Sequence, residues 1–177
     1  MSGEEAKALL QEKCSGKIEE KESNGVTKLS CSLKDKGDYF YKNITLRQKD
    51  KVGKIKLSLA MNYKSDASDE DIEKLRKSEA EKLVQAYGKP TATLEGREIL
   101  DLPRIIEIDS LKTDDPAEIV MCWGDCSEMK TEDETGLIPN PDAKHYAMAG
   151  ILQSGMGVDI ALTVIDAQLS KEMTEAK

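Results

Sequence analysis

The fold is decided by residues 54–63, Lys-Ile-Lys-Leu-Ser-Leu-Ala-Met-Asn-Tyr. An apolar or aromatic side chain at every odd-numbered position alternates here with a lysine, a small or a polar side chain at every even-numbered one. This period of two is typical of a β-strand, because successive side chains of a strand point to opposite faces of the sheet. The strand therefore has one apolar face, and we expect a helix to cover it.

Further strands are predicted on both sides of this stretch, from apolar runs that end in turn-forming residues. The Asn24-Gly25 pair favours a tight hairpin, since both residues readily adopt positive φ angles. Pro103 would place its strand at an edge of the sheet, because proline has no N–H to donate to a neighbour. The expected strands are 17–22, 26–33, 39–48, 99–108, 118–124, 145–153 and 158–166.

Two helices are expected. Residues 4–13 are strong helix formers with apolar side chains on one face. The second helix should run from Ser68 to Tyr87, where apolar residues recur at helical spacing. Ser68 and Asp71 resemble a capping box at its start, and Gly88 follows its last turn.

Together these elements predict a single α+β domain over residues 4–166. Its sheet should be twisted and mainly antiparallel, with about six strands, and disulfides should brace it. The longer helix should cover one face of the sheet and the N-terminal helix an edge. We expect residues 1–3 to derive from an expression vector, residues 127–143 to form an exposed acidic loop, and residues 167–177 to form a polar tail.

The four cysteines indicate a compartment. They fall into two local pairs, so of the three possible connectivities we predict Cys14–Cys31 and Cys122–Cys126. Structural disulfides persist in oxidising compartments, which predicts a periplasmic or secreted protein. The first residues carry no basic and apolar secretory signal, so an exported chain would have lost its signal already. The alternative is a cytosolic protein with free thiols.

Charge narrows the choice of partner. The 177 residues carry a net charge of −8, with a pI near 4.9. Such a chain repels phosphate backbones, so we expect no nucleic-acid partner and a protein partner with basic character. No apolar run is long enough for a transmembrane segment.

No pattern in the sequence supports a catalytic centre. Three residues separate Cys122 from Cys126, where thioredoxin-type redox motifs have two. The cysteine spacings do not suit zinc, and the acidic stretches lack the pattern of an EF-hand. His145, the single histidine, has no sequence neighbours that indicate a triad. We therefore predict no catalytic residue, metal or cofactor.

Protein binding is predicted instead. Tryptophan and charged groups are frequent in interfaces, and acidic surfaces steer association with basic partners. The candidate contact residues are Trp123, Glu128, Glu132, Asp133 and Glu134. For Trp123 the first expectation is a role as an anchor for core packing, and contact with a partner is expected if the ring is exposed.

A family resemblance points the same way. A helix ending in Tyr87-Gly88-Lys89-Pro90-Thr91, a strand carrying Trp123 between cysteines, and an alternating last strand to Asp166 resemble small exported proteins of Gram-negative bacteria. Some of these are periplasmic immunity proteins that neutralise the toxins of rival cells. The resemblance implies a non-enzymatic inhibitor that acts by protein–protein binding. The alternatives are an enzyme or carrier for a small molecule or envelope component, and a structural envelope protein that self-associates through Ile99–Ile108.

One prediction follows from the acidic candidates. Reversing Glu132, Asp133 and Glu134 to lysine should slow association with a basic partner and leave the fold intact, because charge complementarity acts mainly on the association rate. Stopped-flow association kinetics at several salt concentrations measure this. Unchanged kinetics in the triple variant would contradict it.

Overall fold

The computed structural model describes residues 1–62, 66–96, 118–130, 135–140, 142–154 and 157–175. The helices are α1 (Gly3–Lys13), α2 (Asp69–Tyr87) and α3 (Ala167–Glu175). The strands are β1 (Glu19–Ser23), β2 (Val26–Ser32), β3 (Tyr41–Gln48), β4 (Val52–Asn62), β5 (Ala92–Gly96), β6 (Glu118–Gly124), β7 (Cys126–Lys130), β8 (Thr135–Pro139), β9 (His145–Ser154) and β10 (Gly157–Asp166).

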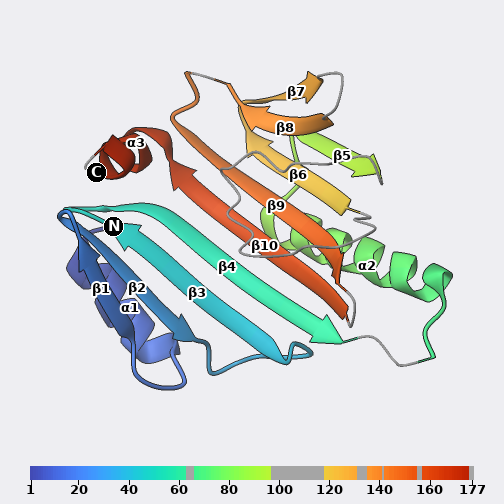
Figure 1. Cartoon of the computed structure of the whole chain (residues 1–177), viewed down its shortest axis with the longest axis horizontal. Coiled ribbons are helices and arrows are strands. Elements are labelled where there is room, and N and C mark those ends of the chain that lie inside the picture. Colours follow the sequence, from blue (N-terminus) through green and yellow to red (C-terminus); the bar gives the residue numbers. More distant parts are fainter. Residues whose placement is uncertain (63–65, 97–117, 131–134, 141, 155–156, 176–177) are drawn as a thin grey trace.

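The strands form one large antiparallel sheet and a separate two-stranded hairpin (Figure 1). The large sheet has the strand order β1-β2-β3-β4-β10-β9-β6-β5, and β7 pairs with β8. This confirms an α+β fold with a mainly antiparallel sheet. The described part of the chain has eight strands in that sheet and three helices, where about six and two were predicted. The strand predicted at 99–108 lies outside the described residues.

Among the described elements, the order is the same in the two halves of the chain. α1 is followed by β1, β2, β3 and β4, and α2 by β5, β6, β9 and β10, with the β7–β8 hairpin inserted. The last strands of the two halves, β4 and β10, pair at the centre of the sheet, with Leu59 opposite Ile160. Two four-stranded meanders are thereby joined into one sheet.

Both long helices cover the same face of the sheet, which we call the helix face. α1 buries Ala6 and Leu10 against Leu29 and Leu46 of strands β2 and β3. α2 packs on β9 and β10, and its Leu83 belongs to the core cluster that contains Leu59. The prediction that the first helix covers an edge was therefore wrong, because its apolar side chains meet the interior strands β2 and β3.

The opposite face, which we call the front face, faces the viewer in Figure 1. On the β6–β9 side it is covered by the β7–β8 hairpin, whose Leu137 is buried against Val120 and Met148. Much of the predicted loop 127–143 is therefore strand. A loop was predicted because this stretch contains many turn-forming and acidic residues. The strands form instead because Leu137 is buried by contacts with β6 and β9, which the local sequence does not indicate.

The segment predicted as a polar tail contains helix α3. Asp166 caps its start, with Oδ1 accepting a hydrogen bond from the backbone N–H of Leu169 at 3.0 Å. Leu169 and Met173 are one turn apart and pack on β4 at Gly53, where a Cβ atom would lie 2.8 Å from the Leu169 Cβ. Glycine permits this close approach. This helix of nine residues is therefore stabilised by packing against β4, which its mainly polar sequence did not indicate.

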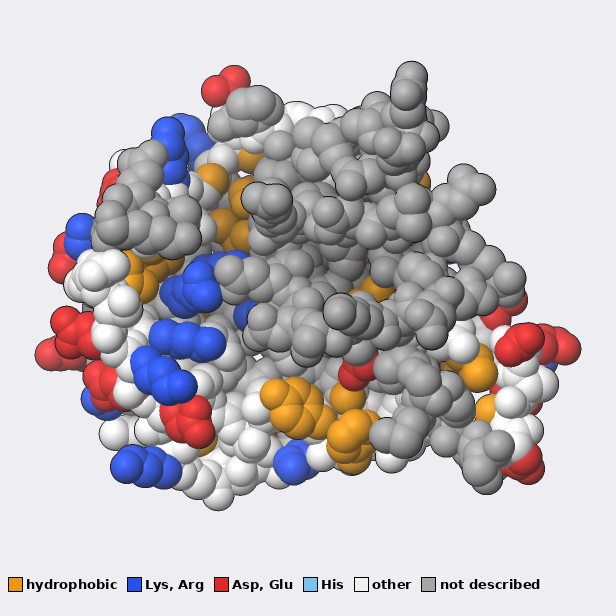
Figure 2. Space-filling model, in the orientation of Figure 1, with side chains coloured by type: hydrophobic (Ala, Val, Ile, Leu, Met, Phe, Trp, Pro, Cys, Tyr) orange, Lys and Arg blue, Asp and Glu red, His pale blue; other side chains and the backbone are white. Residues whose placement is uncertain are grey.

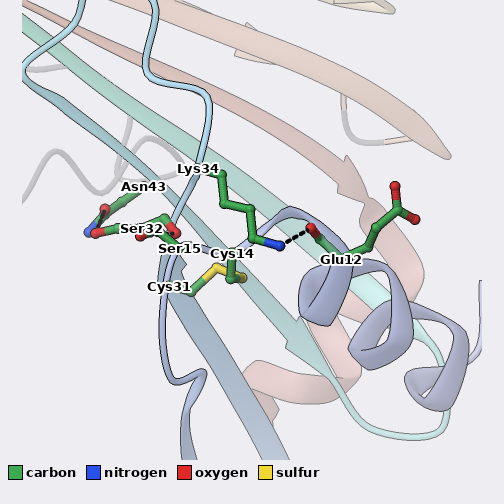
Figure 3. Close-up of a disulfide and its surroundings, with 7 residues drawn as sticks. All are labelled: Glu12, Cys14, Ser15, Cys31, Ser32, Lys34 and Asn43. Carbon is green, nitrogen blue, oxygen red and sulfur yellow. Dashed lines mark hydrogen bonds between the residues drawn. A yellow bond between two sulfur atoms is a disulfide. The ribbon is translucent and has the colours of Figure 1, made fainter.

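Both predicted disulfide pairings are present. Cys14, at the end of α1, is bonded to Cys31 of β2, with their Cα atoms 5.9 Å apart (Figure 3). The Lys34 ammonium group donates a hydrogen bond to the Glu12 carbonyl oxygen at 2.8 Å beside this bridge. The second bridge joins Cys122 of β6 to Cys126 of β7. One disulfide therefore holds α1 to the sheet, and the other fixes the start of the β7–β8 hairpin.

A buried carboxylate holds the two halves of the chain together. Glu79 of α2 is 1% exposed, and its Oε2 accepts a hydrogen bond from the Tyr39 hydroxyl at 2.5 Å. Its Oε1 accepts one from Lys82 at 2.6 Å. Burial raises the pKa of Tyr39 well above its usual value, and the hydrogen bond to Glu79 raises it further. The tyrosine before β3 is thus tied to the helix of the other half.

Tyr39→Phe should lower the free energy of unfolding at pH 7 by about 1–3 kcal/mol, because it leaves a buried carboxylate oxygen without this donor. Since the folded state raises the tyrosine pKa, the stabilisation is complete below the unfolded value of about 10 and declines as the pH rises further. Urea unfolding at pH 7 and above pH 10 measures both effects. Tyr87→Phe, at the exposed tyrosine that ends α2, is the matched control. Equal losses in the two variants would contradict a special role for Tyr39.

Candidate binding face

The front face of strands β1 to β4 is polar because alternation places there the side chains that do not enter the helix-face core. A depression of about 230 Å³ lies on this face. Its charged lining residues are Lys28, Arg47, Lys54 and Lys56, and its neutral ones are Ser30, Tyr41, Asn43, Thr45 and Ser58. Figure 2 shows lysine and arginine side chains gathered over this half of the front face.

Four of the basic side chains form a line across the strands, which we call the basic row: Lys21, Lys28, Arg47 and Lys54. The register places Lys21 opposite Lys28, Lys28 opposite Arg47, and Arg47 opposite Lys54. Directly opposite residues of antiparallel strands share a face, and neighbouring strands are about 4.8 Å apart. The row therefore spans about 14 Å across four strands.

The basic row brings like charges together. Like charges directly opposite on neighbouring strands are destabilising, by roughly 0.2–1 kcal/mol per pair. The protein as a whole carries a net charge of −8, so the row contrasts with its average surface. A local positive potential on an acidic protein attracts anionic groups to one place on its surface.

Neutral hydrogen-bonding side chains adjoin the row in the depression and beside it. The Ser32 hydroxyl donates a hydrogen bond to Asn43 Oδ1 at 2.7 Å, and Asn43 Nδ2 donates one to the Tyr41 hydroxyl at 2.8 Å. These bonds fix the orientation of the Asn43 amide. Carboxylates and other oxyanions accept hydrogen bonds from ammonium, guanidinium, amide and hydroxyl groups. The arrangement is suited to anion binding.

Trp123, the first of the predicted contact residues, lies on the other face of the sheet. The residue is half-buried, and its Nε1 donates a hydrogen bond to the Gly88 carbonyl oxygen at 2.8 Å. Its ring makes a T-shaped contact with the Tyr87 ring, with 6.2 Å between the centroids. The residue thus fixes the end of α2 to β6. Of the two roles considered for Trp123 from the sequence, these contacts correspond to the anchoring role. Contact with a partner stays a prediction.

The acidic contact residues are only partly placed. Glu128 lies in β7, paired with Leu137 of β8. Glu132, Asp133 and Glu134 lie outside the described residues. An acidic docking surface at 128–134 therefore stays a prediction, separate from the basic row, which comes from strands β1 to β4.

His145 belongs to a capping arrangement. Its Nε2 lies 3.1 Å from Asp166 Oδ2, while the other oxygen of Asp166 caps α3. The imidazole is exposed, with 75% of its side-chain surface accessible. Within the described ranges, no group of three or more His, Cys, Asp and Glu side chains could hold a metal ion. None of the helices seen there is long and apolar enough to cross a membrane.

The basic row was missed in the sequence, although one signal was visible. Lys54 and Lys56 occupy the even positions of the alternating stretch, which marks them as front-face residues. Lys21, Lys28 and Arg47 come from three other strands. Which of them stand opposite one another depends on strand register, and a shift of one residue would send each to the other face.

Comparison with protein-family models, curated proteins and solved structures found no match to this chain.

Lys28→Glu should stabilise the protein relative to Lys17→Glu, by a few tenths to about 1 kcal/mol, because it replaces two repulsive cross-strand pairs by attractive ones. Lys17→Glu makes the same change in net charge as Lys28→Glu. Lys17 is exposed and lies outside the strands, so its reversal serves as the control. Urea unfolding at low ionic strength gives the comparison, and added salt should reduce the difference. If Lys28→Glu is no more stable than the control, the row is not under net repulsion.

Proposed function

We propose that this protein is a non-enzymatic binding protein of an oxidising compartment, and that the basic row docks an acidic segment of a partner protein. The observation that carries the proposal is the register that sets Lys28 opposite Lys21 and Arg47. Clustered like charge opposes folding, and its cost is offset when an anionic partner binds. A surface of this kind is typical of recognition rather than of a structural core.

The compartment is supported by the two disulfides. Cys14–Cys31 and Cys122–Cys126 need an oxidising environment to persist. A periplasmic or secreted location is therefore part of the proposal. A role as an immunity-type inhibitor of a secreted toxin is its most specific form, and it requires a partner that presents acidic groups to the row.

A protein fits the row better than a nucleic acid does. A phosphate backbone would extend well beyond the row of about 14 Å and meet a surface whose net charge is negative. A folded partner can place a few carboxylates against the row and neutral or basic groups against the surrounding acidic surface. Acidic side chains on successive turns of a helix are about 5.4 Å apart, close to the spacing of the strands.

The proposal is tested with a defined probe, a fluorescently labelled helical peptide bearing one glutamate per turn on one face. Wild-type protein should bind it with an affinity that falls as salt is added. The double variant Lys28→Glu, Arg47→Glu should bind it at least ten-fold more weakly, mainly through slower association. Fluorescence anisotropy and stopped-flow kinetics measure these quantities.

The matched control is Lys17→Glu, Lys36→Glu, which makes the same change in net charge at exposed positions outside the strands. It should bind the probe within about two-fold of wild type, because distant exposed charges are screened at physiological salt. Equal losses in the two double variants would show that only net charge matters, and would overturn the proposal. Tighter binding of single-stranded DNA than of the peptide would assign the row to another ligand class.

A further inference from the structure

The helix face contains a groove that the proposed function does not use. It has a volume of about 690 Å³ and lies between α2 and strands β5 and β6. Ile119 and Met121 of β6 line its floor, and both are buried. One wall is the flank of α2 with Ala80 and Val84, and the other is β5, whose Thr93 lies opposite Met121 on the same face of the sheet. Every lining residue belongs to the described ranges.

The groove follows from the size of the elements. α2 packs on β9 and β10, the strands nearest the centre of the sheet in its half. A helix is about 10 Å across, whereas four strands span about 14 Å between the first and the last. Among the described residues, one helix placed over β9 and β10 therefore leaves the outer strands β6 and β5 partly uncovered. The apolar residues that face α2 from β6 form the floor of this space.

The polar residues that line the groove are Lys77, Glu81, Gln85, Lys89, Thr91 and Thr93. Lys77 lies toward one end of the groove, where its ammonium group pairs with Glu73 at 2.9 Å. Lys89 lies at the other end, directly after Gly88 caps α2. The α2 residues that line the wall run from Lys77 to Gln85, about 12 Å along the helix axis. The groove thus has an apolar floor, mixed walls and a cationic side chain, Lys89, at one end.

We propose that this groove binds a single-chain amphiphile, with its alkyl chain on Ile119, Met121 and Val84 and its anionic head group at Lys89. The volume lies within the range of roughly 300–1,000 Å³ common for small-ligand sites, which are mostly apolar with a few polar groups that fix orientation. Each methylene group that is buried adds a favourable transfer free energy. The site goes beyond the basic row, which lies on the other face of the sheet.

An alkyl chain fits the walls better than a peptide does. The backbone of α2 is hydrogen-bonded within the helix, and β5 pairs with β6 along the floor. The Thr91 N–H, at the end of the groove, already donates to the Cys122 carbonyl oxygen. A peptide backbone over the apolar floor of Ile119 and Met121 would leave buried polar groups without partners there, which is costly, whereas an alkyl chain has none.

The chain supplies its own reporter for the test. Trp123 is the only tryptophan, and it follows Met121 by two residues on the same face of β6. The probes are sodium decanoate, decan-1-ol and a lysophospholipid with a ten-carbon chain, each used below its micelle concentration. Wild-type protein should bind decanoate saturably, with a change in tryptophan fluorescence and one site by calorimetry. The lysophospholipid then shows whether a free fatty acid or a lipid is the better source of the chain.

Two variants separate chain from head group. Ala80→Phe fills the groove and should weaken decanoate binding at least ten-fold, whereas Ala86→Phe, on an exposed position of the same helix, should not. Lys89→Glu should weaken decanoate at least five-fold and leave decan-1-ol unchanged. If Ala80→Phe does not fold, as judged by circular dichroism, Lys89→Glu decides the question.

The proposal is overturned if wild-type protein shows no saturable decanoate binding, or if Ala80→Phe and Ala86→Phe behave alike. It is also overturned if an apolar peptide displaces decanoate and binds more tightly. Lys28→Glu, on the front face, should leave decanoate binding unchanged. Failure of this site is therefore distinguishable from failure of the basic row.

Discussion

The pairing of β4 with β10 is the constraint on which the rest of the structure depends. Nine residue pairs join these strands, from Gly157 opposite Asn62 to Ile165 opposite Lys54. Each strand ends a four-stranded meander that has its own helix, and without this pairing each meander would expose a long edge. The pairing also aligns the apolar face of β4 with that of β10. One core cluster therefore includes Leu59, Ile160 and Leu83 of α2.

A single sheet with both long helices on one face leaves the other face for different uses. In the second half of the chain, the front face is apolar under the β7–β8 hairpin. In the first half it is polar, and register concentrates Lys28, Arg47 and Lys54 there. The protein thus carries a positive surface within a negative whole, at some cost in folding free energy. On the helix face, one helix covers too few strands to close the groove over Ile119 and Met121.

Sequence patterns correctly predicted those elements that are determined by neighbouring residues in the chain. The alternation in residues 54–63 indicated β4. The Asn24-Gly25 pair indicated the first hairpin, and both residues have positive φ. Ser68 and Asp71 indicated the start of α2, where they form a capping box. The missed elements depend on distant contacts. β5 is short and stabilised by pairing with β6, and α3 packs on Gly53. The basic row was missed for the same reason, because its residues come from four strands and only their register brings them together.

The central claim is that the two halves form one cooperative sheet, so that the basic row lies on a rigid platform. Native-state amide hydrogen exchange tests it most directly. Backbone amides of β3, β4, β9 and β10 should exchange only through global unfolding, with one common free energy that equals the value from urea unfolding. Two separate free energies, one for β1 to β4 and a different one for β9 and β10, would show that the halves open independently and would contradict the account.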